Sequence, residues 1–221
     1  MKNVHLEILV EDQSGSIILE NILAKISASL PLDLTYRIHA YSGLGKLPKN
    51  LSKDNDPQKR ALLSKLPMLL RGYGRSSGEQ SAVVIVVDSD KNDCKMLKNE
   101  LNEVLDSCLI PPKTAFCIAI EEIEAWLLGD RQALLEAYPQ AKTSVLEGYI
   151  QDSICNTWEL LADAIVKEMS KGLKKKGYPE IGIRKCEWAE KVSPNMNIQN
   201  NSSPSFQHFV NKITEFAGQS A

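Results

Sequence analysis

Acidic side chains follow two segments of the sequence that are otherwise apolar. Asp88 and Asp90 come after the valine-rich run 82–87, and Glu11 follows the apolar end of segment 4–10. Carboxylate oxygens are the ligands that Mg²⁺ takes, with waters and substrate phosphates in its other positions. Two carboxylates held together are costly unless a metal ion or a proton neutralises them. The pattern predicts a divalent-metal site, for Mg²⁺ or Mn²⁺, with Glu11, Asp88 and Asp90 as ligands.

Phosphodiester cleavage is the chemistry that such a site serves. Two ions about 4 Å apart stabilise both the attacking and the leaving oxygen of a phosphodiester. Glu121 and Glu122 follow a further apolar segment, 114–120, and we expect one of them to complete the site. Glu124 shares a helix face with Glu121, so all three glutamates cannot reach one place.

The segments that carry these acids alternate between strand and helix patterns. Strands are predicted at 4–10, 34–40, 82–87 and 114–120, and helices at 15–29, where Ser14 is the expected N-cap, 58–73, where Pro67 should kink or divide the helix, and 93–107. This alternation is typical of an α/β fold with a four-stranded parallel sheet flanked by helices. Because Glu11 must approach Asp88, the first and third strands should be neighbours, in the order 2-1-3-4. Ligands bind beyond the carboxyl ends of such strands.

The remainder of the chain is predicted to be helical. Helices are expected at 121–128, 131–138, 156–170, 183–191 and 205–217, with a basic loop at 171–177. We therefore expect a catalytic domain over residues 1–130 and a helical carboxy-terminal extension, 131–221, packed on it.

Each acid also has a purely structural interpretation. Glu11 is favoured near a helix start by the helix dipole, and so are the glutamates after residue 120. Asp88 and Asp90 would also fit a plain strand-to-helix turn, and Asp93 is more often an N-cap than a ligand.

The composition limits what the protein binds. The 221 residues include 26 basic and 28 acidic side chains, for a net charge of −2, so net charge does not predict nucleic-acid binding. The five cysteines have no paired spacing, which argues against a disulfide framework or a zinc site. No apolar stretch is long enough to span a membrane, and we expect a cytoplasmic protein.

Several basic residues are candidates for binding phosphate. Lys46 ends the segment Gly43-Leu-Gly45-Lys46, which lacks the spacing of an ATP-binding loop but could contact a scissile phosphate. We expect the nucleic-acid contacts to come from Arg71, Arg75, Lys174, Lys175, Lys176, Arg184 and Lys185. The alternative is that these residues form solvated surface.

The two acidic strand ends resemble the Toprim domain. The resemblance covers about residues 1–130 and depends on Glu11 after LEILV (6–10) and on Asp88-Ser-Asp90 after VVIVV (83–87). That domain occurs in topoisomerases, bacterial primases, small ribonucleases and overcoming-lysogenization-defect nucleases. The resemblance implies a Rossmann-like fold and Mg²⁺-dependent phosphoryl transfer on nucleic acid. It makes Glu11 a general acid/base or a ligand and the aspartates ligands.

A similarity over nearly the whole chain is to an uncharacterised bacterial Toprim-like family of about this length. It is carried by LPMLLRGY (66–73), VDSDKNDC (87–94), AIEEIEAWLLGD (119–130) and SPSF (203–206). It implies a role in anti-phage or mobile-element systems, beside an AAA- or ABC-type ATPase.

The leading hypothesis is a Toprim-type nuclease in phage defence, cutting DNA or RNA with Mg²⁺. One alternative is a non-catalytic or toxin-like regulatory subunit of an ATPase complex. Another is a phosphoesterase or sensor for a small nucleotide, since one site geometry serves any phosphoester. The sequence leaves the oligomeric state open, a homo-oligomer included.

Overall fold

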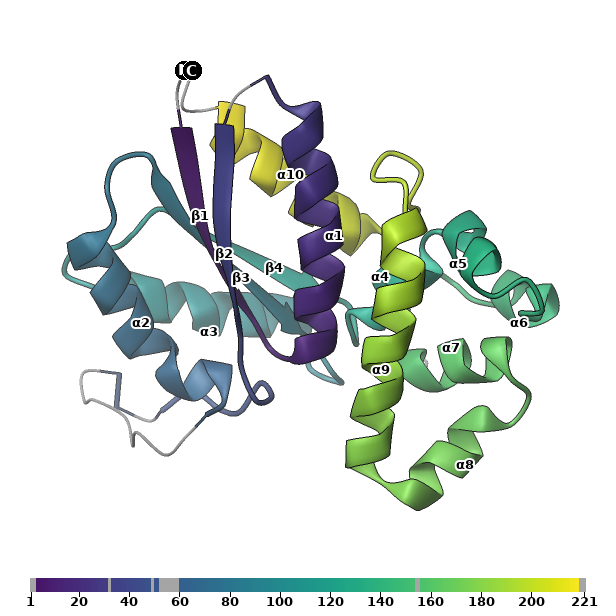
Figure 1. Cartoon of the computed structure of the whole chain (residues 1–221). Coiled ribbons are helices and arrows are strands. Elements are labelled where there is room, and N and C mark those ends of the chain that lie inside the picture. Colours follow the sequence, from purple (N-terminus) through teal and green to yellow (C-terminus); the bar gives the residue numbers. More distant parts are fainter. Residues whose placement is uncertain (1–2, 32, 49, 52–59, 154–155, 219–221) are drawn as a thin grey trace.

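A four-stranded parallel sheet forms the centre of the protein in this computed structural model (Figure 1). The structure describes residues 3–31, 33–48, 50–51, 60–153 and 156–218. The strands are β1 (Asn3–Val10), β2 (Asp33–Ala40), β3 (Ser81–Asp88) and β4 (Thr114–Ala119). Their order is β2-β1-β3-β4, and every neighbouring pair is parallel. The predicted α/β architecture and the predicted contact between the first and third strands are confirmed.

Helices cover both faces of the sheet (Figure 1). On one face lie α1 (Gln13–Ser29) and α10 (Pro204–Gly218), and on the other lie α2 (Leu62–Ser76) and α3 (Cys94–Asp106). Alternation along β3 sends Val84 and Val86 towards α1, whereas Val83, Ile85 and Val87 face α2 and α3. Asp88 is the next residue in the first set, so its side chain belongs to the α1 side of the sheet.

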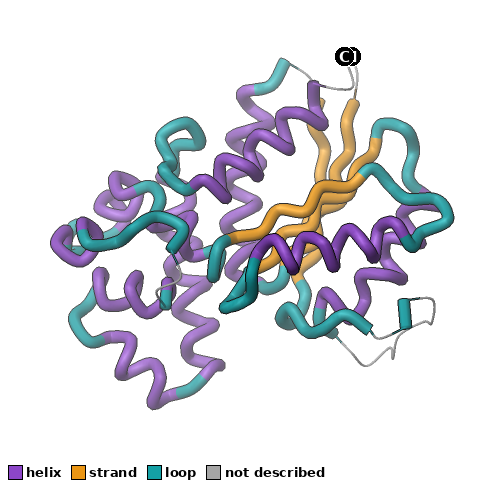
Figure 2. The backbone as a smooth tube through the Cα atoms, turned by 180° about the vertical axis from the view of Figure 1, so that it is seen from behind, coloured by secondary structure: helices purple, strands orange, loops and turns teal. Residues whose placement is uncertain are grey.

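In the described part of the chain, further α-helices follow β4 and gather beside the sheet. They are α4 (Glu124–Leu128), α5 (Arg131–Ala137), α6 (Thr143–Glu147), α7 (Thr157–Ile165), α8 (Met169–Lys176) and α9 (Tyr178–Val192). Seen from behind, most of them form a group to one side of the strands (Figure 2). Helix α9 packs against α1, and one apolar core contains residues from both sides of position 130, among them Ile18, Trp126 and Trp188. The helical part therefore shares its core with the sheet.

Three local predictions need correction, and one helix lies where none is predicted. The N-cap of α1 is Asp12 and not Ser14, because the Asp12 carboxylate accepts the Gly15 N–H at 2.8 Å. Pro67 does not divide α2, which runs unbroken from Leu62; residues 58 and 59 lie outside the described ranges. The expected basic loop at 171–177 is mostly helix α8. Helix α6 was not predicted.

Two further predictions concern the chain as a whole. Within the described ranges, no helix is both long and apolar enough to cross a membrane. Cys94, Cys108, Cys117 and Cys186 are free thiols, and Cys155 lies outside the described residues.

Trp126 joins the helical part to the sheet. Its ring is fully buried, 5.5 Å from the Phe206 ring and 5.3 Å from the Phe209 ring, both on α10. Its indole N–H donates to Ser205 Oγ at 2.9 Å. These contacts link α4 to α10, which lies on the same face of the sheet as α1.

We expect Trp126→Ala to lower the free energy of unfolding by about 3–5 kcal/mol, because it leaves a large cavity in the shared core. Denaturant titrations followed by circular dichroism and by the fluorescence of the other tryptophans should give one coincident transition. Leu109→Ala is the control, since that side chain is 97% exposed. Two separate transitions in the wild-type protein would contradict a shared core.

Candidate functional site

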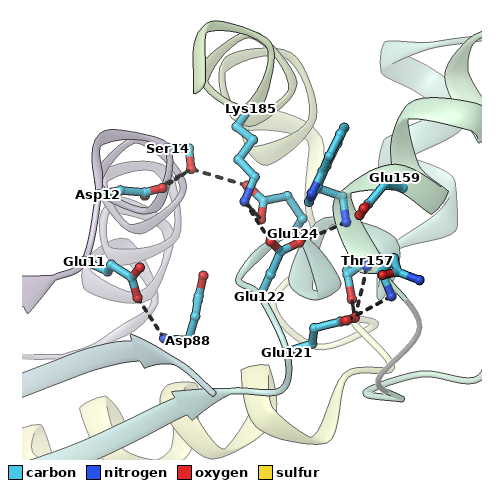
Figure 3. A network of polar contacts seen from close by, with 12 residues as sticks. Glu11, Asp12, Ser14, Asp88, Glu121, Glu122, Glu124, Thr157, Glu159 and Lys185 are labelled. Atoms are coloured by element: carbon cyan, nitrogen blue, oxygen red, sulfur yellow. Dashed lines mark hydrogen bonds and ion pairs between the residues drawn. The ribbon is translucent and has the colours of Figure 1, made fainter. Parts of the chain in front are cut away.

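Glu11 and Asp88 lie side by side at the carboxyl ends of β1 and β3 (Figure 3). The strand register pairs Val10 with Val86, which places Glu11 next to the end of β3. The Glu11 carboxylate accepts the Asp88 backbone N–H at 3.4 Å. Strand pairing therefore brings together the two acids that the sequence predicts as metal ligands.

The surroundings of this pair disfavour its negative charges. Burial raises the pKa of Glu11 to about 7, and repulsion from Asp90 adds to the shift, although the backbone N–H groups of Asp88 and Leu44 oppose it. Burial also raises the pKa of Asp88 well above its usual range, and repulsion from Glu11 acts in the same direction. Two enclosed carboxylates of this kind need a proton or a cation near neutral pH.

Lys185 of α9 reaches into the same region (Figure 3). Its ammonium group lies 3.0 Å from Glu124 Oε2 and 3.2 Å from Glu122 Oε1. Burial lowers the pKa of Lys185, but attraction to Glu124, Glu122 and Asp88 outweighs burial and raises it well above the usual value. Lys185 is therefore a buried cation among carboxylates. The prediction that it contacts nucleic acid is corrected, because the side chain is only 13% exposed.

Glu122 and Glu124 are held from several directions. Glu122 Oε2 accepts the Trp158 N–H at 3.0 Å, and burial raises its pKa to about 7, with repulsion from Glu124 adding. The Ser14 hydroxyl lies 3.3 Å from Glu124 Oε1, and the Glu124 side chain has no exposed surface. Glu122 thus shares Lys185 with Glu124, and its catalytic role stays a prediction.

Glu121 points away from this network (Figure 3). Its carboxylate accepts the backbone N–H groups of Asn156 at 2.9 Å and Thr157 at 3.0 Å, and also the Thr157 hydroxyl. The left-handed backbone of Glu121, with φ of +60°, and a bond from its N–H to Ser89 Oγ direct the side chain there. Glu121 therefore caps the start of α7, and its expected catalytic role is corrected.

The Asp90 side chain does not point to the same side of the sheet as that of Asp88. Strand β3 ends at Asp88, and the backbone of Asp90 is left-handed, with φ of +49°. It is exposed and lines a cleft of about 1090 Å³ together with Glu11. Asp90 still lies close enough to raise the pKa of Glu11. The three predicted ligands are therefore neighbours, with Asp88 enclosed and Asp90 at the surface.

Lys46 lines the same cleft. The segment before it is fixed beside Glu11, because the Gly43 N–H donates to the Glu11 carbonyl at 3.0 Å. Ser64 Oγ in turn donates to the Lys46 carbonyl at 3.2 Å. Gly43, with φ of +84°, makes the turn that allows this approach. The structure thus brings Lys46 to the predicted site.

The other predicted nucleic-acid residues do not form one basic surface. Lys174 pairs with Glu159 at 2.9 Å, Lys176 lies 3.5 Å from Glu180, and Arg184 lies close to both Glu180 and Glu187. Lys175 lies between the two paired lysines and is exposed. On α2, Arg71 donates to the Leu51 carbonyl at 2.5 Å. Arg75 lies near the amino ends of the strands, away from Glu11 and Asp88, because the adjoining Gly74 contacts Ile110, just before β4 begins.

The residues present suit a hard cation. Among the described residues, no three His, Cys, Asp or Glu side chains are placed to hold a metal ion without other ligands. Mg²⁺ needs only one or two carboxylates, since waters and substrate phosphates complete its shell. Glu11 and Asp88 supply oxygen donors of that kind, and their enclosure disfavours leaving both charges unbalanced. The metal site remains a prediction that these residues fit.

Residues 10–214 match the model of a family described as a domain of unknown function, DUF4276. The chain belongs to this family. None of the curated proteins and none of the solved structures matches it. The family description names no activity, so the resemblance to the Toprim domain stays a prediction.

Lys185 and Glu124 are the site residues whose roles the sequence analysis missed. A signal for Lys185 is its position on the apolar stripe of α9, between the buried residues Ile181 and Trp188. A lysine on a buried helix face needs a carboxylate partner. Glu124 lies on a short, entirely buried helix, which marks it in the same way.

The raised pKa of Glu11 predicts how stability depends on pH. The folded protein holds this proton up to about pH 7, whereas the unfolded chain releases it near 4.5, so this residue lowers stability as pH rises through that interval. The wild-type free energy of unfolding should therefore fall by roughly 3 kcal/mol more than that of Glu11→Gln as pH rises, since each pKa unit corresponds to about 1.4 kcal/mol.

The measurement is the denaturation midpoint of both proteins in EDTA between about pH 5 and about pH 8. Glu147→Gln is the control, because Glu147 is exposed and remote from the network. Parallel pH profiles for the wild-type protein and Glu11→Gln would contradict the prediction.

Proposed function

We propose that this protein cleaves phosphodiester bonds of nucleic acid with the help of Mg²⁺ or Mn²⁺. The observation that carries the proposal is the pair of carboxylates, Glu11 and Asp88, at the carboxyl edge of a parallel sheet, with Glu11 lining a cleft that also contains Lys46. Parallel α/β folds bind ligands at that edge. The resemblance of these strand ends to the Toprim domain supports the same chemistry.

In this reaction, side chains of the protein bind the cation, orient the water and accept its proton. Glu11, Asp88 and Asp90 would hold the cation, and Glu11 would orient the attacking water. A bond forms between the water oxygen and phosphorus while the bond from phosphorus to the leaving oxygen breaks. Glu11 accepts the water proton, and the leaving oxygen takes a proton from solvent. When bound, the metal ion lowers the pKa of that water and neutralises charge on the phosphoryl oxygens.

Lys46 and Lys91 are the basic residues that line the cleft within the described part of the chain. The same lining contains five acids, Glu11, Asp90, Asp93, Glu100 and Glu103. A polyanion entering this cleft therefore depends on a bound cation and on the two lysines for attraction. This dependence supports a metal-bridged mode of binding.

Tyr178 supports a nucleic acid as the substrate. It lies at the start of α9, its side chain is 85% exposed, and it lines both the cleft and an adjoining pocket that contains Glu122. An exposed aromatic ring beside a phosphate site is suited to stack on an unpaired base. The charged surface near Tyr178 comes from α8, through Lys175 and its paired neighbours.

A second candidate is hydrolysis of a small nucleotide. The acidic lining of the cleft favours it, because a mononucleotide places fewer phosphates against those acids than a polymer does. The two candidates share the catalytic residues and differ in their dependence on Tyr178.

The setting is part of the same proposal. We place the protein in the cytoplasm, acting in phage defence beside an AAA- or ABC-type ATPase, as the similarity over nearly the whole chain implies. A non-catalytic subunit would bind that ATPase equally well without its carboxylates, so activity assays decide between the two.

Asp88→Asn should reduce Mg²⁺- or Mn²⁺-dependent cleavage about 100-fold or more, because it removes a charge that holds the cation at the reacting phosphate. Thermal stability in EDTA should be equal or higher, since repulsion with Glu11 is relieved. The assay uses plasmid, single-stranded DNA and tRNA, with the ATPase added where one is encoded alongside. Asp33→Asn, exposed at the opposite edge of the sheet, is the control. A wild-type protein inert on all three substrates would contradict the proposal.

Tyr178→Ala should weaken binding of single-stranded nucleic acid about 5- to 100-fold, because stacking on one base contributes about 1–3 kcal/mol. Fluorescence anisotropy of a labelled oligonucleotide measures this, and Tyr178→Phe, which keeps the ring, is the matched control. Ile183→Ala, exposed on the same helix, controls for surface changes. Equal affinity of Tyr178→Ala and wild-type protein would favour the small-nucleotide substrate.

A further inference from the structure

Lys185 occupies the centre of one half of the acidic network. Its ammonium group lies within 3.2 Å of a carboxylate oxygen from each of Glu122 and Glu124. Its charge also opposes the effect of burial on Asp88 and Asp90, although burial prevails and the pKa of each is raised. One lysine therefore pairs directly with two carboxylates and acts at longer range on Asp88 and Asp90.

Glu124 depends on that lysine. Its side chain has no exposed surface, and its Oε2 atom accepts no hydrogen bond from the described residues. The ammonium group of Lys185 at 3.0 Å is the charge that balances this oxygen. A buried carboxylate with such an oxygen would otherwise need another cation or a proton.

Helix α9 fixes where the ammonium group lies. Ile181, Trp188 and Val192 hold one face of the helix in the core, and Lys185 lies on that face. Since α9 packs against both α1 and α4, the lysine enters between the helix that follows Glu11 and the helix that begins at Glu124. Its place is therefore set by packing as well as by charge.

We infer that Lys185 serves as a built-in cation on the Glu122–Glu124 side of Asp88, so that this site holds a single divalent ion, on the Glu11 side. The inference deepens the proposed function, on which it rests. An ammonium ion cannot leave the protein as a metal ion can, so it balances these carboxylates at any metal concentration. In this arrangement Lys185 is a positioning residue: its ion pairs fix Glu122 and Glu124 and leave Glu11 and Asp88 to the metal ion.

The test is the number of Mn²⁺ ions bound per chain, measured by equilibrium dialysis and by electron paramagnetic resonance. We expect one ion for the wild-type protein and two for Lys185→Gln, because the variant leaves Glu122, Glu124 and Asp88 without their cation. In EDTA, Lys185→Gln should have a lower melting temperature than the wild-type protein. Adding Mn²⁺ should raise the melting temperature of Lys185→Gln by more than it raises that of the wild-type protein. Lys185→Arg, which keeps the charge, should bind one ion.

Glu122→Gln gives a second test should Lys185→Gln fail to fold. It removes one carboxylate and leaves the Glu124–Lys185 pair, so we expect it to bind one Mn²⁺ ion, as wild type does. Two ions in the wild-type protein, falling to one in Glu122→Gln, would overturn the inference and leave the proposed function intact. No ion in the wild-type protein at saturating Mn²⁺ would contradict the proposed metal-dependent function and overturn the single-ion site with it. Equal stoichiometry in wild type and Lys185→Gln would overturn the inference.

Discussion

The buried ion pairs of Lys185 with Glu122 and Glu124 are the interaction on which the candidate site depends. They join α9 to the turn and short helix that follow β4, and they set the charge around Asp88. Breaking a buried pair by removing one partner is strongly destabilising, because an uncompensated charge is left behind. The network therefore constrains the fold and the chemistry of the site together.

This constraint gives the helical part of the chain a role in the site. The sheet alone supplies Glu11 and Asp88, two carboxylates whose burial opposes ionisation. Helix α9, far along the sequence, supplies the positive charge that opposes this effect at Asp88. Because the apolar core is continuous across position 130, the lysine and the strand ends are held in one packed unit.

Much of the fold and part of the site could be predicted from the sequence. Apolar strands that end in acids fix the sheet edge, and the need for Glu11 to approach Asp88 fixes the strand order. The directions of the Asp90 and Glu121 side chains could not be predicted, because left-handed residues at 90 and 121 redirect the chain just past the strands. Alternation and helical periodicity do not extend through such turns. Charge alone predicts a surface position for Lys185, whereas its place on the apolar stripe of α9 indicates a buried one.

The central claim is that the Glu11–Asp88 pair holds a divalent cation. Anomalous diffraction from crystals soaked in Mn²⁺ tests it most directly, since the signal locates the ion without reference to activity. We predict a peak in contact with carboxylate oxygens of both Glu11 and Asp88, which is absent from crystals of Asp88→Asn. A well-ordered site with no peak there at saturating Mn²⁺, or a peak only at carboxylates elsewhere on the surface, would contradict the claim.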